Sequence, residues 1–165
     1  MTSARFEYIG NSITIHGGAG NDVIWGNSGK NTLFGDTGND RITGASSDDI
    51  IAGGSGNDIL HGGGGTDIFT FCSDWGKDTV QQLEDGMVIL WFKENLDVSW
   101  DESTMTCSCG ENSVVVSGVS ADHVMIKYGA KDKQDAEQYA NLTAMGGFDE
   151  KTSENVFEIT KNTLA

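Results

Sequence analysis

A nine-residue period runs without a gap through residues 17–70 and constrains the fold more than any other feature. Six successive units have the sequences GGAGNDVIW, GNSGKNTLF, GDTGNDRIT, GASSDDIIA, GGSGNDILH and GGGGTDIFT. Position one is glycine and position eight is apolar in every unit. A flexible glycine-rich linker would not keep an apolar residue at a fixed place. The period therefore predicts a solenoid in which similar units stack on one another.

Each position of the unit has a physical role. Glycine at position one, and at position four in every unit except the one with Ser47, permits tight turns and positive φ angles. The last three residues of a unit form a short strand, and its middle side chain points inward because side chains alternate along a strand. Two units then complete one coil. The apolar side chains that fill the coils are Ile24, Leu33, Ile42, Ile51, Leu60 and Phe69.

The turns carry the ligands that a hard cation prefers. Position six is aspartate in five units and asparagine, Asn31, in the other. Calcium takes about six to eight oxygen ligands, which carboxylates and backbone carbonyls supply. The formal net charge of −15 attracts cations and disfavours nucleic acid and anionic membranes as partners. Because the predicted core is thin, bound ions would have to contribute much of the folding free energy.

These units resemble the GGxGxDxUx nonapeptides of RTX (repeats-in-toxin) proteins. The resemblance implies an all-β fold, a right-handed parallel β-roll solenoid that binds several calcium ions. The side-chain ligands that we expect are Asp22, Asn31, Asp40, Asp49, Asp58, Asp67 and Asp78. The expected carbonyl ligands belong to Gly17, Ala19, Asn21, Gly35, Thr37, Asn39, Gly53, Ser55 and Asn57.

In such a roll each unit stacks on the unit two further along, so the turns form two columns. The first column contains the turns that end at Asp22, Asp40 and Asp58, and the second contains those that end at Asn31, Asp49 and Asp67. The second column has lost a charge at Asn31 and a glycine at Ser47. An amide keeps an oxygen ligand but removes a unit charge from the ion's surroundings, so we expect the first column to bind calcium more tightly.

The register extends beyond the six units at both ends. Upstream, Ile13–His16 continues it with Ile15 at position eight, but Ile13 stands where aspartate belongs, which predicts a half-turn without a full ion site. Downstream, residues 76–80 restore the spacing after a two-residue slip. Asp78 either closes the last site or is a solvated aspartate at a strand end.

The pattern changes after residue 70, and we predict a roll over residues 1–80 and a β-rich region with one helix over residues 81–165. Residues 78–83 and 87–92 are predicted to form a hairpin around the turn at residues 84–86. Further strands are expected at 96–100, 105–109, 114–119, 123–128 and 156–159, and a helix at 131–145 before Gly146 and Gly147. This region is either a cap over the open end of the solenoid or an independent domain tethered to it.

Catalytic motifs are absent from the sequence. It has no H-E-x-x-H stretch and no G-x-S-x-G elbow, so we expect no enzyme activity in this chain. Cys107 and Cys109 lack the second half of a zinc site and are expected to be buried thiols, with a disulfide to Cys72 as the alternative. No stretch of about 18 apolar residues predicts a membrane span, and residues 1–11 lack the layout of a cleaved secretion signal.

The resemblance implies a calcium-binding, non-catalytic module of a bacterial protein exported by a type I secretion system. Such a module would fold when it meets calcium outside the cell, with calcium and the secretion machinery as its partners. Two alternatives remain. The chain could be an accessory module of a larger secreted enzyme, such as a protease, lipase or polysaccharide epimerase. It could also be an adhesin module that binds an extracellular ligand through its C-terminal half.

Overall fold

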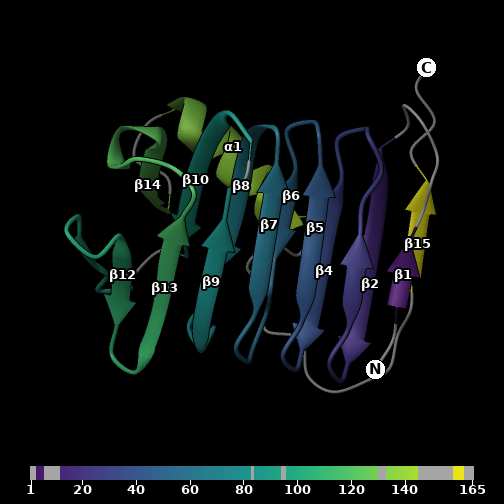
Figure 1. Ribbon diagram of the computed structural model, residues 1–165, viewed down its shortest axis with the longest axis horizontal. Helices are drawn as coiled ribbons and strands as arrows, with labels where there is room; N and C mark the ends of the chain where they lie inside the picture. Colours follow the sequence, from purple (N-terminus) through teal and green to yellow (C-terminus); the bar gives the residue numbers. More distant parts are fainter. Residues whose placement is uncertain are drawn as a thin grey trace.

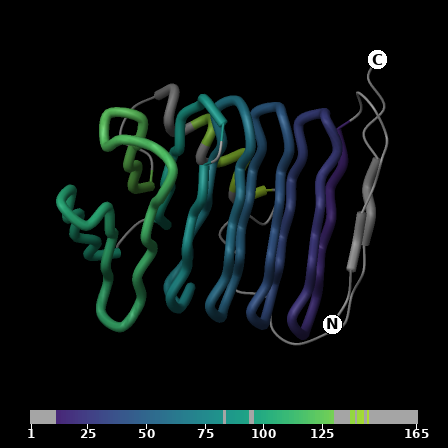
Figure 2. The backbone as a smooth tube through the Cα atoms, viewed as in Figure 1, coloured from purple at the N-terminus to yellow at the C-terminus, as the bar shows by residue number. Residues whose placement is uncertain are grey.

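The computed structural model describes residues 3–5, 12–82, 84–93, 96–129, 133–144 and 158–161. Two sheets face each other, and the chain winds from one to the other in narrow coils (Figures 1 and 2). The first sheet has the order β1 (Ser3–Arg5), β3 (Val23–Trp25), β5 (Arg41–Ala45), β7 (Ile59–Gly63), β9 (Lys77–Gln81), β13 (Asn112–Ser117), β12 (Thr106–Cys109) and β11 (Ser99–Asp101). The second has the order β14 (Val124–Tyr128), β10 (Gly86–Phe92), β8 (Gly65–Phe71), β6 (Ile50–Ala52), β4 (Thr32–Thr37), β2 (Ile13–Ala19) and β15 (Glu158–Lys161).

The strands of the repeats pair in parallel with the predicted register. In the first sheet Ile24 lies beside Ile42, which lies beside Leu60. In the second sheet Leu33 lies between Ile15 and Ile51. Each unit therefore stacks on the unit two further along, and the predicted parallel β-roll is confirmed. The extension of the register to Ile15 is confirmed as well.

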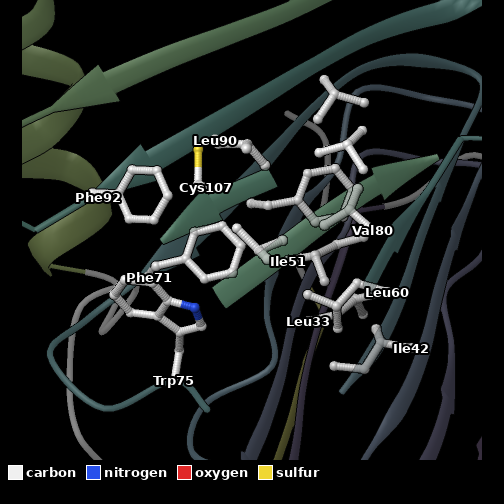
Figure 3. Packing of buried hydrophobic residues seen from close by; sticks show 14 of the residues in the cluster. Leu33, Ile42, Ile51, Leu60, Phe71, Trp75, Val80, Leu90, Phe92 and Cys107 are labelled. Atoms are coloured by element: carbon white, nitrogen blue, oxygen red, sulfur yellow. The ribbon is translucent and has the colours of Figure 1, made fainter. Parts of the chain in front are cut away.

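The core is a single row of side chains between the two sheets. The position-eight residues of all six units are buried, and Ile15, Val80 and Leu90 continue the row in both directions. Several of them are labelled in Figure 3, where they lead into a cluster of aromatic side chains. Such a row gives each coil only two apolar side chains, so no coil can bury its own core and stacking is obligatory.

The roll does not end at the last repeat. Strands β9 and β10 lie in opposite sheets, each parallel to the preceding strand of its own sheet. The predicted hairpin between residues 78–83 and 87–92 is therefore wrong. The apolar run at residues 88–92 is buried, which fits a strand covered on both faces. The predicted division at residue 80 remains a prediction, and both sheets run across it.

The end of the roll is covered by strands that break the repeat. β13 and β14 add one more parallel strand to each sheet, while β11 and β12 extend the first sheet in antiparallel pairing. Inside this end, the ring centroid of Phe71 lies 5.0 Å from that of Phe92 and 5.6 Å from that of Trp75. Figure 3 shows these rings beside Cys107, which is fully buried. Large aromatic side chains thus fill the end of a core that is otherwise one side chain wide.

A second apolar cluster lies on the outer face of the second sheet. Ile68, Ile89 and Trp91 alternate along their strands with core residues, so they point away from the core, and Leu142 of helix α1 (Lys133–Ala144) packs against them. The predicted helix is confirmed, while Gly146 and Gly147 lie outside the described residues. In the described part, no helix has the length and hydropathy that a bilayer span requires. Cys107 and Cys109 are free thiols, so neither forms the alternative disulfide with Cys72. Cys107 is buried as predicted, and burial raises its pKa to about 12, whereas Cys109 is only half-buried.

Candidate metal sites

The aspartates of the first column form a ladder inside the stacked turns. The backbone N–H of Asp22 donates to Oδ1 of Asp40 at 2.7 Å, and the N–H of Asp40 donates to Oδ1 of Asp58 at 2.7 Å. Asp58 continues the ladder to Oδ1 of Asp78 at 2.9 Å. Each of these carboxylates thus uses Oδ1 to accept a hydrogen bond from the backbone of the turn before it. Asp78 is 3% exposed, so the alternative that it is a solvated aspartate at a strand end is wrong.

The second oxygen of four carboxylates in the two columns has no hydrogen bond. Oδ2 of Asp40, of Asp58 and of Asp78 is buried without a hydrogen bond, and so is Oδ2 of Asp49 in the second column. A buried carboxylate oxygen without a donor is costly, and cation binding is one of the few ways to offset that cost. These four oxygens therefore fit a calcium ion as missing partner.

Glycine at position one lets two oxygen atoms approach its backbone closely. A Cβ added to Gly17 would lie 2.8 Å from Oδ2 of Asp22 and 2.8 Å from the carbonyl oxygen of Gly35. The same pair of groups, a carboxylate Oδ2 and the carbonyl of the next glycine in the column, surrounds the missing Cβ of Gly35 and of Gly44. We call this arrangement a cradle. Any side chain at position one would clash with these two oxygens and push them apart.

Burial raises the pKa of these carboxyl groups. Desolvation is the largest cause, and it raises the pKa of Asp40 to about 8, of Asp58 to about 6 and of Asp78 to about 9. It also raises the pKa of Asp49 to about 7 and of Asp67 to about 6. In the described part of the chain, none of these five carboxylates has a lysine, arginine or histidine partner. The protein thus leaves a row of buried acids without counter-charge.

Asp36 shows the contrast with a carboxylate that has protein partners. It occupies position two of its unit with a φ of 74°. Its Oδ2 accepts a hydrogen bond from the N–H of Gly18 at 3.2 Å and lies 3.3 Å from Nδ1 of His16. A carboxylate satisfied in this way has no need of an ion, although the turn contains one acidic residue more than the repeat requires.

The second column has the same ladder of hydrogen bonds from backbone N–H groups to carboxylates, but it begins at an asparagine and ends at a glutamine. The N–H of Asn31 donates to Oδ1 of Asp49 at 2.7 Å, and the N–H of Asp49 donates to Oδ1 of Asp67 at 2.9 Å. At the far end, Gln82 is fully buried, and its Nε2 donates to Oδ2 of Asp67 at 3.3 Å. Sequence reasoning missed Gln82, because it follows the last unit and the repeat assigns no role to its position.

The predicted carbonyl ligands are arranged in two ways. Those of Gly35 and Gly53 lie at the cradles. Those of Thr37 and Ser55 accept hydrogen bonds at 2.9 Å from Gly20 and Gly38, and each keeps a second lone pair. The remaining carbonyls stay predictions, as does the binding of an ion by each residue of the set. In the described residues, no three His, Cys, Asp or Glu side chains converge, so the backbone would have to supply most ligands of each ion.

The comparisons with known proteins agree with this geometry. The family model of the RTX calcium-binding nonapeptide repeat, which contains four copies of the repeat, matches residues 14–42 and again residues 34–69. The chain carries an RTX calcium-binding repeat array. The RTX match covers the coils that contain the cradles and leaves residues 70–165 unmatched. A comparison with curated proteins gave no match. RTX repeats bind calcium, several ions to an array, and act as non-catalytic binding modules.

The two columns of the RTX array should differ in their response to loss of one aspartate. We expect Asp40→Ala to lower the calcium affinity more than Asp49→Ala, because Asp40 has a carboxylate in the turn before it and in the turn after it. Titration of both variants by isothermal calorimetry checks this. A larger loss of affinity in Asp49→Ala would contradict the ranking.

Proposed function

We propose that this chain is a calcium-dependent folding module, which stays expanded without calcium and forms the roll when calcium binds. The observation that supports it is the row of buried carboxylates at Asp40, Asp49, Asp58 and Asp78, each with one oxygen, Oδ2, that has no hydrogen bond. In the folded state without ions these groups must be either protonated or desolvated as anions, and both are unfavourable at neutral pH. Calcium supplies the missing charge, so the free energy of binding becomes free energy of folding.

The charge of the whole chain acts in the same direction. With 25 acidic and 10 basic residues, the expanded chain is favoured by self-repulsion until cations bind. Each coil contributes only two side chains to the core, so hydrophobic burial offsets little of this charge repulsion. The repeat array therefore depends on its ions more than a domain with a thick core does.

Such a switch suits export through a narrow channel. Extracellular calcium modules have dissociation constants of about 10⁻⁴ to 10⁻³ M, far above the calcium concentration of a cytosol. The chain would thus remain expanded inside the cell, pass through type I secretion machinery, and fold outside. Secretion is typical of RTX proteins, and the proposal places this chain outside the cell or on its surface.

Circular dichroism tests the switch directly. Strand content should be low in chelator and should rise to that of the folded roll when calcium is added to millimolar concentration. Magnesium at the same concentration should have little effect, because it demands near-octahedral geometry and gives up its water reluctantly. A spectrum in chelator that equals the spectrum in calcium would show that the roll folds without ions and would end the proposal.

A further inference from the structure

The side chain of Asn31 has an unusually complete set of hydrogen bonds for a residue at position six. Its Nδ2 donates to the carbonyl of Asn27 at 2.9 Å, to Oδ1 of Asp49 at 2.9 Å and to the carbonyl of Gly44 at 3.2 Å. Its Oδ1 accepts from the N–H of Asn27 at 3.3 Å. The residue is 2% exposed. These partners define the orientation of the amide, because reversing it would set an amide N–H against the N–H of Asn27 and would remove the donor from three acceptors.

The nitrogen of this amide lies where the other turns have a carboxylate oxygen. A Cβ added to Gly26 would meet Nδ2 of Asn31 together with the carbonyl oxygen of Gly44. One turn further along the column, a Cβ added to Gly44 would meet Oδ2 of Asp49 together with the carbonyl oxygen of Gly62. The two cradles thus have the same shape and differ in one atom. At Asp49 that atom is a buried oxygen without a partner, and at Asn31 it is a donor with three acceptors.

We propose that the carboxamide of Asn31 takes the place of a calcium ion at the first turn of the second column. This inference rests on the proposal that the cradles of the other turns bind calcium. An ion at the Gly26 cradle would face the hydrogens of Nδ2, which carry partial positive charge, and would compete with them for Gly44 and Asp49. The oxygen ligand that the sequence predicted at Asn31 instead accepts a hydrogen bond from Asn27. The array therefore binds fewer ions than its number of turns suggests.

The turn at residues 26–31 is held together by its own asparagines. Oδ1 of Asn27 accepts from the N–H of Gly29 at 2.8 Å, and the amide of Asn31 bonds to Asn27 and to the next turn of the column. Hydrogen bonds of this kind need no ion and depend weakly on ionic conditions. The second column thus begins with a turn that calcium does not have to order.

Two substitutions that interchange aspartate and asparagine test the inference, because each should change the number of bound calcium ions by one. Native mass spectrometry of the full chain at saturating calcium should show one more calcium in Asn31→Asp than in the wild type. The matched variant Asp49→Asn should show one fewer. Asp49→Asn should also keep its fold, because the new amide can donate to Gly62 and Asp67 as Asn31 donates to Gly44 and Asp49. An unchanged count in Asn31→Asp, with tighter binding, would mean that Asn31 already holds an ion and would overturn the inference.

A measurement on the wild type covers the case in which Asn31→Asp fails to fold. In calcium-saturated protein the side-chain NH₂ protons of Asn31 should exchange slowly with solvent in NMR spectra, whereas those of the exposed Asn21 should exchange fast. Fast exchange at Asn31 would show that the amide has turned its oxygen to an ion. A wild type that binds no calcium would end the proposed function, and slow exchange at Asn31 would still support the hydrogen-bonded turn.

Discussion

A chain that ends at residue 70 should not gain strand structure when calcium is added, although it contains all six repeats. The truncation removes Asp78, which accepts the hydrogen bond from Asp58, and Gln82, which donates to Asp67. It also exposes Leu60 and Phe69, which are fully buried in the intact chain, and leaves both sheets with open edges. A calcium titration followed by circular dichroism checks this. Normal folding of residues 1–70 would show that the C-terminal region is a tethered domain and not a cap.

If the C-terminal region is a cap, one substitution in its aromatic cluster should destabilise the roll without removing any predicted ligand. Phe92→Ala empties the centre of the aromatic cluster, where the Phe92 ring lies 5.0 Å from Phe71 and 5.3 Å from Trp75. We expect a loss of about 3–5 kcal/mol in the free energy of unfolding at saturating calcium. Met125→Ala, at a side chain of the same region that is 42% exposed, is the matched control and should change stability by about 0.5 kcal/mol or less. Equal effects of the two would contradict the cap.

Acidification should fold the calcium-free chain. Burial raises the pKa of Asp40 to about 8, of Asp58 to about 6 and of Asp78 to about 9, from the ordinary aspartate value of 3.8. Between those values and 3.8 the folded state binds more protons than the unfolded state, so stability falls as pH rises. The stabilising effect is complete below about pH 4 and is lost as pH rises through about 6 to 9. Each unit of difference changes the folding equilibrium about tenfold.

Circular dichroism between about pH 4 and 9 in buffer stripped of calcium measures this effect. Asp78→Asn replaces the acid with the most raised pKa by an amide that is uncharged at every pH, so its unfolding on alkalinisation should shift to higher pH. Glu111→Gln, at an exposed side chain, should leave the transition unchanged. With calcium present the trend should reverse, because protons compete with the ion for the same carboxylates. A calcium-free chain that loses structure on acidification would contradict the assignment.

The repeat period determined most of the roll. Inward residues at position eight, the stacking of every second unit and the separation of the turns into two columns all follow from a nine-residue unit with a fixed apolar position. Register in a sheet is strongly specified when one face is buried, since a slip of one residue would turn Ile42 or Leu60 to the outside. For this reason the pairings of Ile24, Ile42 and Leu60 could be predicted without a structure.

The sequence could not assign strands beyond the repeats to a sheet. The apolar run at residues 87–92 predicted a strand but was placed in a hairpin with residues 78–83, whereas β9 and β10 lie in opposite sheets. An apolar run shows that a strand is buried and does not show which neighbour buries it. The buried ring cluster of Phe71, Trp75 and Phe92 arises from segments that only the folded chain brings together.

Only the tertiary structure showed whether the side chain at position six places an oxygen or a nitrogen atom at its cradle. In sequence terms Asn31 is a weaker copy of the aspartates, with an oxygen still available. In the folded chain its nitrogen faces Gly44 and Asp49, because Asn27 needs an acceptor for its own N–H. Gln82 reaches Asp67 in the same way, from outside the repeat. Hydrogen-bond partners determine which way a carboxamide points. Those partners come from neighbouring coils, so the sequence of a single unit cannot show them.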